Sequence, residues 1–319
     1  MGNSWAKYLN TVESGGGRNP LLLAASGGHT STVELLITRG SSILSVDSEG
    51  NTALHLASQI GDYDTLAVME KLRGDDFNTA RLGRAPPLHV AVERGITDVV
   101  ELLLQHGASA NMERLPLQTP VHVAMQHGKP EVLYLLLRHG GDPNAVDWEG
   151  RASLHIAIHR QDTKYFEMTM KLLLQRGADV DAQDSNGFTP LMMYICCHLA
   201  HPLLQYRSPP THLETLISKT RSPRTVNIFG RTALHYAASC DVPPTAVEGL
   251  LAAGAHPLTR DKLGHTPLYY SLLRDGTDVE HDSEEKTTGW LACFSTLLNA
   301  IPLKERPRQL SEALLAAVK

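Results

Sequence analysis

The sequence predicts an all-α solenoid of about eight stacked helix-turn-helix units, connected by β-hairpin or turn fingers. Two observations predict this fold. A short motif recurs at a nearly constant interval, and most copies are followed by a second apolar run that ends near a glycine. Apolar runs of this length and spacing favour helices, and an internal period of about 20 to 50 residues is typical of repeat architectures.

The recurring motif has the form Thr-Pro-Leu-His-x-Ala, with variations from copy to copy. Its eight copies begin at Asn19, Thr52, Pro86, Thr119, Ala152, Thr189, Thr232 and Thr266. The first five starts lie 33 or 34 residues apart, and the remaining intervals are 37, 43 and 34 residues. The longer intervals indicate insertions within an otherwise regular array.

Each copy of the motif predicts the start and the end of a short first helix. A Thr can cap a helix N-terminus, and a Pro directly after it fits the first helical position, where its missing N–H costs nothing. In the regular copies a glycine follows nine residues after the start, at Gly28, Gly61, Gly95 and Gly128. Glycine readily adopts the left-handed conformation that ends many helices.

A second helix and a turn complete each unit. Apolar runs such as 99–104 and 132–137 predict the second helix, with Gly107 and Gly140 closing them. Asp-x-x-Gly turns then follow, beginning at Asp47, Asp147, Asp184 and Asp261. Helices shorter than about 12 to 15 residues are marginal in water, so each unit must pack on its neighbours in one continuous core.

These motifs resemble those of the ankyrin repeat family. The resemblance rests on Thr-Pro-x-His-x-Ala, on the segment Gly-Ala-Asp-Val-Asp and on the Asp-x-x-Gly turn at a spacing of 33 residues. It implies a repeat array over 19–301 with insertions near 198–211 and 274–289, an N-terminal capping segment at 1–18 and a C-terminal capping helix at 302–319. It also implies a non-catalytic scaffold that binds a protein or peptide partner in a concave groove.

In the family's pattern, variable positions in the turns and at the ends of the first helices line this groove. The resemblance therefore implies a partner-binding role for Glu93, Arg94, Gln126, His127, Trp148, Glu149, Arg151, His159, Arg160, Asn186, Phe188, Phe229 and Arg231. Trp148 has two interpretations. Trp and Arg dominate interface energetics, which favours an anchor for a ligand. The ring could instead pack on a neighbouring finger through Pro143 or Leu115.

Composition narrows the class of partner and the compartment. The net charge is −5 and no basic stripe is present, which argues against nucleic acid as a partner. Four irregularly spaced cysteines suit a reducing compartment. No apolar run reaches the roughly 18 residues that span a bilayer, and the polar start is not a secretory signal. We expect an intracellular monomer of the cytoplasm or nucleus, without a transmembrane segment.

The motif histidines could be interpreted as metal ligands, but they occupy the same place in units that lie too far apart to share an ion. The resemblance implies instead that each imidazole bonds the Thr position and nearby backbone. These residues are His55, His89, His122, His155 and His235.

A denser set of soft ligands, Cys196, Cys197, His198 and His201, could bind zinc, yet no second pair lies at the usual finger spacing. Phosphate-binding loops, serine elbows and metalloprotease motifs do not occur in the sequence. We therefore expect no metal, no cofactor and no catalysis.

Two segments depart from the repeat. Tyr194 stands where other copies of the motif have a small residue, and a bulky side chain there needs local repacking, so a kink or a widened groove is expected near 191–216. The acidic run 274–286, before an apolar helix at 290–298, is predicted to be a solvated insert. A docking site for a basic partner is the alternative.

The sequence also allows a second function, substrate recognition within a ubiquitin ligase complex, because some ankyrin proteins are subunits of such complexes. The tail 309–318 has a slight resemblance to the elongin-binding helix of a SOCS box, although Leu314 stands where a Cys is expected and no cullin-contact segment follows. A capping helix is the competing interpretation. Gly2 also opens a sequence that resembles an N-myristoylation start, with Ala6 in place of Ser or Thr.

Overall fold

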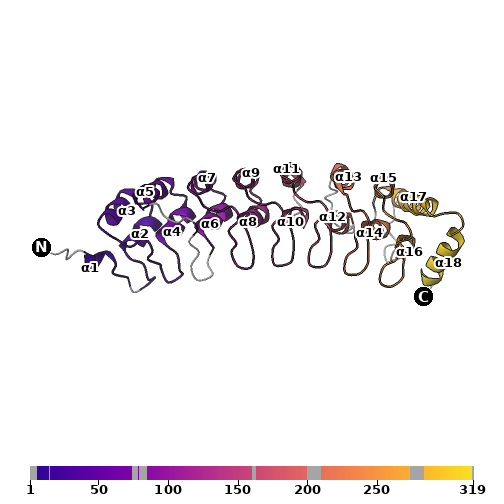
Figure 1. Cartoon of the computed structure of the whole chain (residues 1–319), viewed down its shortest axis with the longest axis horizontal. Helices are drawn as coiled ribbons and strands as arrows, with labels where there is room; N and C mark the ends of the chain where they lie inside the picture. Colours follow the sequence, from indigo (N-terminus) through magenta and orange to yellow (C-terminus); the bar gives the residue numbers. More distant parts are fainter. Residues whose placement is uncertain are drawn as a thin grey trace. The chain divides into compact units, whose positions relative to one another are not determined.

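The computed structural model describes residues 6–13, 15–73, 78, 85–159, 163–199, 210–240, 242–273 and 284–317. The chain divides into two compact units, Met1–Trp148 and Glu149–Lys319, and each is described by itself. In both units the described residues form helices joined by turns, which confirms the predicted all-α fold of helix-turn-helix repeats (Figure 1). None of the described helices has the length and apolar character needed to cross a membrane.

The first unit contains α1 (Ala6–Leu9), α2 (Pro20–Ser26), α3 (Thr30–Thr38), α4 (Ala53–Ile60), α5 (Tyr63–Arg73), α6 (Pro87–Arg94), α7 (Thr97–Gln105), α8 (Pro120–His127) and α9 (Pro130–Arg138). The first helices of the repeats, α2 to α4 to α6 to α8, pack in one row. The second helices, α3 to α5 to α7 to α9, pack in another (Figure 1). The apolar core lies between the two rows.

The second unit contains α10 (Ser153–His159), α11 (Thr163–Gln175), α12 (Pro190–Tyr194), a π-helical turn η1 (Ile195–Leu199), α13 (Pro210–Lys219), α14 (Ala233–Ser239), α15 (Pro244–Ala252), α16 (Pro267–Leu272), α17 (Glu284–Ala300) and α18 (Arg306–Ala317). Here α10, α12, α14 and α16 pack in one row that α18 closes, while α13, α15 and α17 pack in the other.

The motif histidines connect the start of one helix to the next finger. In the pair of Thr119 and His122, the N–H of Thr119 donates to Nδ1 at 3.1 Å and Nε2 bonds the carbonyl of Ala145 at 2.9 Å. Because Nδ1 accepts, the ring proton is on Nε2, which donates to that carbonyl. The same reciprocal cap joins Thr52 to His55. These bonds confirm the predicted structural role.

His89 departs from this pattern because Pro86 occupies the N-cap position of α6. Proline has neither an N–H nor a hydroxyl to offer. The buried Nδ1 of His89 therefore has no hydrogen-bond partner, while Nε2 bonds the carbonyl of Gln118 at 3.0 Å. Burial lowers the pKa of His89 to about 4, so this ring is neutral at pH 7.

The helix ends follow the glycines that the sequence indicates. Helices α4, α6 and α8 are each capped by a glycine with a positive φ angle, at Gly61, Gly95 and Gly128. This left-handed conformation turns the chain from the first helix into the second.

The Asp-x-x-Gly segments form tight turns. The Oδ1 of Asp184 accepts from the N–H of Asn186 at 2.9 Å and from that of Phe188 at 2.8 Å. A Cβ on Gly187 would lie 2.8 Å from the Cα of Asn227 in the next finger, so only glycine allows this approach. The described residues contain an isolated bridge but no β-strand, and the fingers are therefore turns rather than β-hairpins.

One helix begins earlier than the sequence predicts. Helix α17 begins at Glu284, ahead of the apolar helix predicted at 290–298, so residues 284–289 are helical. Carboxylates favour a helix N-terminus, and an acidic run can therefore start a helix as well as form a loop. Residues 274–283, with the rest of the predicted acidic docking site, lie outside the described residues. Helix α18 (Arg306–Ala317) lies within the range 302–319 of the predicted capping helix.

Candidate protein-binding surface

The predicted binding residues of the first unit lie at two helix ends and in one turn. Glu93 and Arg94 end α6, Gln126 and His127 end α8, and Trp148 lies in the turn that begins at Asp147. The Trp148 side chain is 57 % exposed. The ring is therefore accessible to a partner, and its role as an anchor stays a prediction.

The fingers of the first unit also expose aliphatic side chains that the sequence analysis did not include in the candidate surface. Leu117 and Val146 are exposed, and Leu115, which the sequence suggested only as a packing partner, is exposed as well. Arg114 in the same finger pairs with the predicted Glu93 at 3.3 Å. The sequence contains a signal for these side chains, because large apolar residues stand inside segments that otherwise consist of turn-forming residues.

At the start of the second unit two predicted residues bond to each other. The guanidinium of Arg151 lies 2.5 Å from the carboxylate of Glu149. His159 is exposed at the end of α10, whereas Arg160 lies outside the described residues. The predicted set thus begins in this unit with an ion pair that neutralises both charges.

Further along the second unit, aromatic rings and one arginine gather beside the fingers. We call Phe188, Phe229, Arg231, Tyr236 and Tyr270 the aromatic strip. The rings of Phe188 and Tyr236 lie 5.4 Å apart, and the Arg231 guanidinium lies 4.6 Å from the Tyr270 ring and 5.9 Å from the Phe229 ring. Asn186, the remaining predicted residue, is exposed in the turn before Phe188. The structure therefore brings three predicted residues together with two tyrosines.

Hydrogen bonds hold Arg231 in one position. Its Nη2 donates to the Tyr270 hydroxyl at 2.7 Å and its Nε donates to Asp261 at 3.3 Å. The Tyr270 hydroxyl donates in turn to Asp261 at 2.5 Å. Burial and this bond to the carboxylate raise the pKa of Tyr270 to about 12. Burial alone would raise the pKa of Asp261, but the bonds from Tyr270, the His265 N–H and Arg231 lower it.

At neutral pH the Asp261 carboxylate and the Arg231 guanidinium are therefore both charged, and Tyr270 keeps its proton. The network fixes a cation beside aromatic faces and compensates its charge. Phe229 next to it is 51 % exposed. These side chains are already ordered in the folded protein, so a partner that binds them causes little further loss of conformational entropy.

The two tyrosines of the strip were missed, although the sequence contains a signal for them. Both stand four residues after the start of their motif copies, at the variable place within Leu-His-x-Ala or its variant. The other copies have aliphatic residues there, among them Leu56, Val90, Val123 and Ile156. A comparison of that single column would have indicated Tyr236 and Tyr270.

Only part of the cysteine cluster lies in the residues that the structure describes. Cys196 and Cys197 lie in η1, and burial raises the pKa of both thiols. His201, the fourth candidate ligand, lies outside the described residues. Over the described ranges no group of three or more His, Cys, Asp or Glu could hold an ion.

Comparison with known proteins identifies the family. A family model described as "Ankyrin repeats (3 copies)" matches residues 5–81, 65–147, 88–168 and 121–207, and one described as "Ankyrin repeat" matches 229–262.

Two curated relatives are similar over shorter stretches. Ankyrin repeat and SOCS box protein 11 of Danio rerio is 40 % identical over 91 residues, which are 28 % of this chain and 30 % of that protein. The B-cell lymphoma 3 protein homolog of Mus musculus is 30 % identical over 156 residues, 46 % of this chain and 34 % of that protein. The chain spans about a third of the length of these relatives. Because the family models match well over half of its residues, the chain belongs to the ankyrin repeat family.

Proposed function

We propose that this protein is a non-catalytic scaffold that binds a peptide or protein partner along the finger side of its repeats. Ankyrin repeats imply protein–protein interaction. The aromatic strip supports the assignment of the contact surface to this part of the second unit. The observation that carries the proposal is the locked Arg231 beside a half-exposed Phe229. Rigid aromatic and arginine side chains are the residue types that anchor interfaces.

The strip suits a partner segment with an apolar side chain next to a hydrogen-bond acceptor. The apolar group would cover the exposed ring of Phe229. A carbonyl or carboxylate would use guanidinium N–H groups of Arg231 other than those bonded to Asp261 and Tyr270, because five N–H donors are available in one arginine. In the first unit Trp148 would act as a separate anchor of the same kind.

Replacing Phe229 with alanine is expected to weaken partner binding by about 2 kcal/mol, or roughly thirtyfold in Kd, because an anchor ring is lost. The unfolding transition should move little, since half of this side chain is already in water. Partners would be identified by affinity purification with mass spectrometry, and Kd for the principal partner would then be measured with purified proteins.

Leu303 provides the matched control for this substitution. It is exposed, apolar and outside the strip, between α17 and α18. Leu303→Ala should leave the Kd unchanged, and Trp148→Ala reports on the first unit separately. Equal binding by the wild type, Phe229→Ala and Trp148→Ala would show that neither ring contacts the partner.

The remaining proposals concern compartment and class of partner. All four cysteines lie among the described residues and none of them forms a disulfide there, which supports a reducing intracellular compartment such as the cytoplasm or the nucleus. The net charge of −5 supports a protein rather than a nucleic acid as the partner. We propose that the scaffold acts as a monomer.

A second candidate function is substrate recognition within a ubiquitin ligase complex. Helix α18 exposes Leu314 and Leu315, and one relative is named for a SOCS box. The same helix packs on α16, where Thr266 donates to Gln309 at 3.3 Å, as a capping helix does. Co-purification of elongins and a cullin with the full chain, lost on Leu315→Asp, would support the ligase role, and their absence would leave α18 as a cap.

A further inference from the structure

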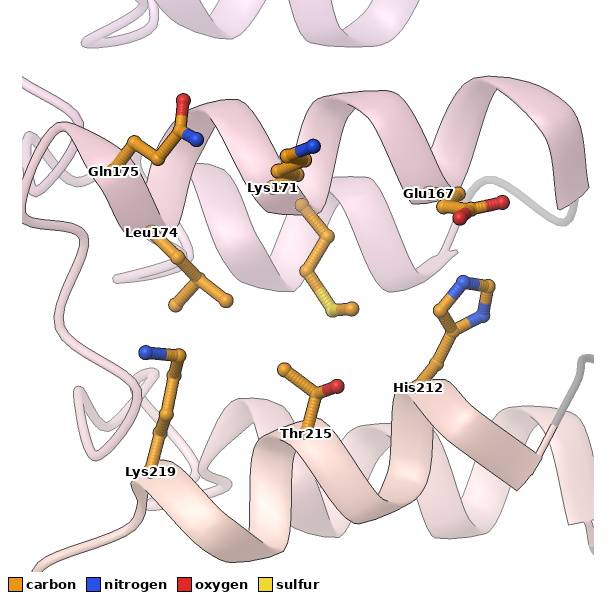
Figure 2. A pocket seen from close by; sticks show the side chains of 8 residues that line it. Glu167, Lys171, Leu174, Gln175, His212, Thr215 and Lys219 are labelled. Atoms are coloured by element: carbon orange, nitrogen blue, oxygen red, sulfur yellow. The ribbon is translucent and has the colours of Figure 1, made fainter.

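A hollow of about 420 Å³ lies in the second unit between the second helices α11 and α13. Figure 2 shows side chains from both helices facing each other across it. Elsewhere in this row α13 packs on α15 and α15 packs on α17. A volume of this size falls within the range of ligand pockets in proteins.

Three buried rings pack together next to the hollow, and one of them, His212, also lines it. Tyr194 stacks on Phe166 with ring centroids 5.9 Å apart, and Phe166 meets the His212 ring edge-on at 5.0 Å. The regular repeats have a small alanine at the place of Tyr194. The hollow therefore follows from a large residue inserted into the core, as expected when a side chain is too bulky for regular packing.

The lining is polarised along its length. Glu167 faces His212 at one end, and Lys219 lies opposite Leu174 at the other end (Figure 2). Met170 forms the apolar wall between these ends. His212 and Lys219 are seven residues apart on α13, which corresponds to about 10 Å at 1.5 Å per residue.

His212 is the group in the lining that indicates an occupant. It is 4 % exposed, and its Nδ1 has no hydrogen-bond partner. Burial lowers its pKa, against the opposing effect of the Glu167 carboxylate, so a neutral ring is favoured. A buried acceptor or donor that is left unpaired destabilises the fold. When the His212 ring turns about its Cβ–Cγ bond, a polar group that enters the hollow can form a hydrogen bond with Nδ1.

We propose that the hollow docks an extended peptide segment of a partner protein, with a basic residue at the Glu167 and His212 end, apolar residues in the middle and an acidic residue at the Lys219 end. Three residue steps of extended chain cover about 10 Å, which matches the separation of the two ends. Lys171 also lines the hollow and adds a second positive charge to it. This surface is separate from the aromatic strip and does not depend on it.

The test uses capped hexapeptides with the cores Lys-Leu-Leu-Glu, Glu-Leu-Leu-Glu and Lys-Leu-Leu-Lys, each flanked by glycines. Binding to the full chain is followed by the methionine methyl NMR signals, with the Met170 signal assigned through Met170→Leu. The mixed-charge peptide is expected to shift the Met170 signal and to bind about tenfold more tightly than the doubly basic peptide. It should also bind more tightly than the doubly acidic peptide.

Charge-reversal variants test the polarity directly. Lys219→Glu should make the doubly basic peptide the best ligand, and Glu167→Lys should make the doubly acidic peptide the best. Both residues are exposed, so neither change should affect folding. Lys262→Glu, an exposed lysine in a finger of the same unit, should leave the preference unchanged.

Equal binding of the three peptides, an unmoved Met170 signal, or preferences that do not follow the charge reversals would overturn the proposal. Phe229→Ala separates this proposal from the proposed function. That variant should bind the hexapeptides as the wild type does, even if it has lost the partner of the aromatic strip.

Discussion

Replacing Tyr194 with alanine is expected to destabilise the second unit by about 3 to 5 kcal/mol, the usual range for removing a large buried aromatic side chain. The result would be notable because alanine is the residue that most other repeats carry at this place. Tyr194 is 1 % exposed and stacked on Phe166, so its removal leaves a cavity that the separated helices can fill only in part.

Hydrogen exchange with mass spectrometry is the suitable measurement, because it reports the opening free energy of each unit separately. Peptides from the second unit should lose protection, while those from the first unit should not change. Tyr194→Phe keeps the ring and is expected to cost less than about 1.5 kcal/mol, as volume-conserving replacements do. Unchanged or increased protection in Tyr194→Ala would show that the ring does not stabilise the second unit.

This position also shows where sequence reasoning reaches its limit. The aligned copies of the motif identify Tyr194 as the unusual residue, because the other copies have a small residue at that position. This comparison also predicts repacking around it. It could not predict the outcome, which is a π-helical turn after α12 and a hollow between two helices. That outcome depends on Phe166 and His212, which lie 28 residues before and 18 residues after Tyr194 in the sequence.

The same distinction applies to the candidate binding surface. The turn around Asp184 and the glycine caps were predictable because each is closed by bonds within about five residues. The position of Arg231 was not, since it is fixed by Tyr270, 39 residues away, and by Asp261, 30 residues away. The sequence marks Arg231 as a groove residue, and only the structure shows that two of its donors are already used.

Replacing His122 with alanine is expected to destabilise the first unit by about 3 kcal/mol or more. The change leaves the N–H of Thr119 and the carbonyl of Ala145 without this ring, and each buried polar group left unpaired costs about 1 to 3 kcal/mol. It also removes a fully buried side chain from the core. The loss should appear as a lower denaturation midpoint and as faster hydrogen exchange around α8.

His89 gives a matched comparison, because it is equally buried in the preceding repeat but lacks the bonds at Nδ1. His89→Ala removes a side chain of the same size and only the bond to Gln118, so it should cost less than His122→Ala by about 1 to 2 kcal/mol. The packing terms largely cancel between the two variants, and the difference measures the reciprocal cap. Equal losses would mean that the histidines stabilise the repeats through packing and the inter-repeat bond alone, with the Thr-His cap contributing nothing measurable.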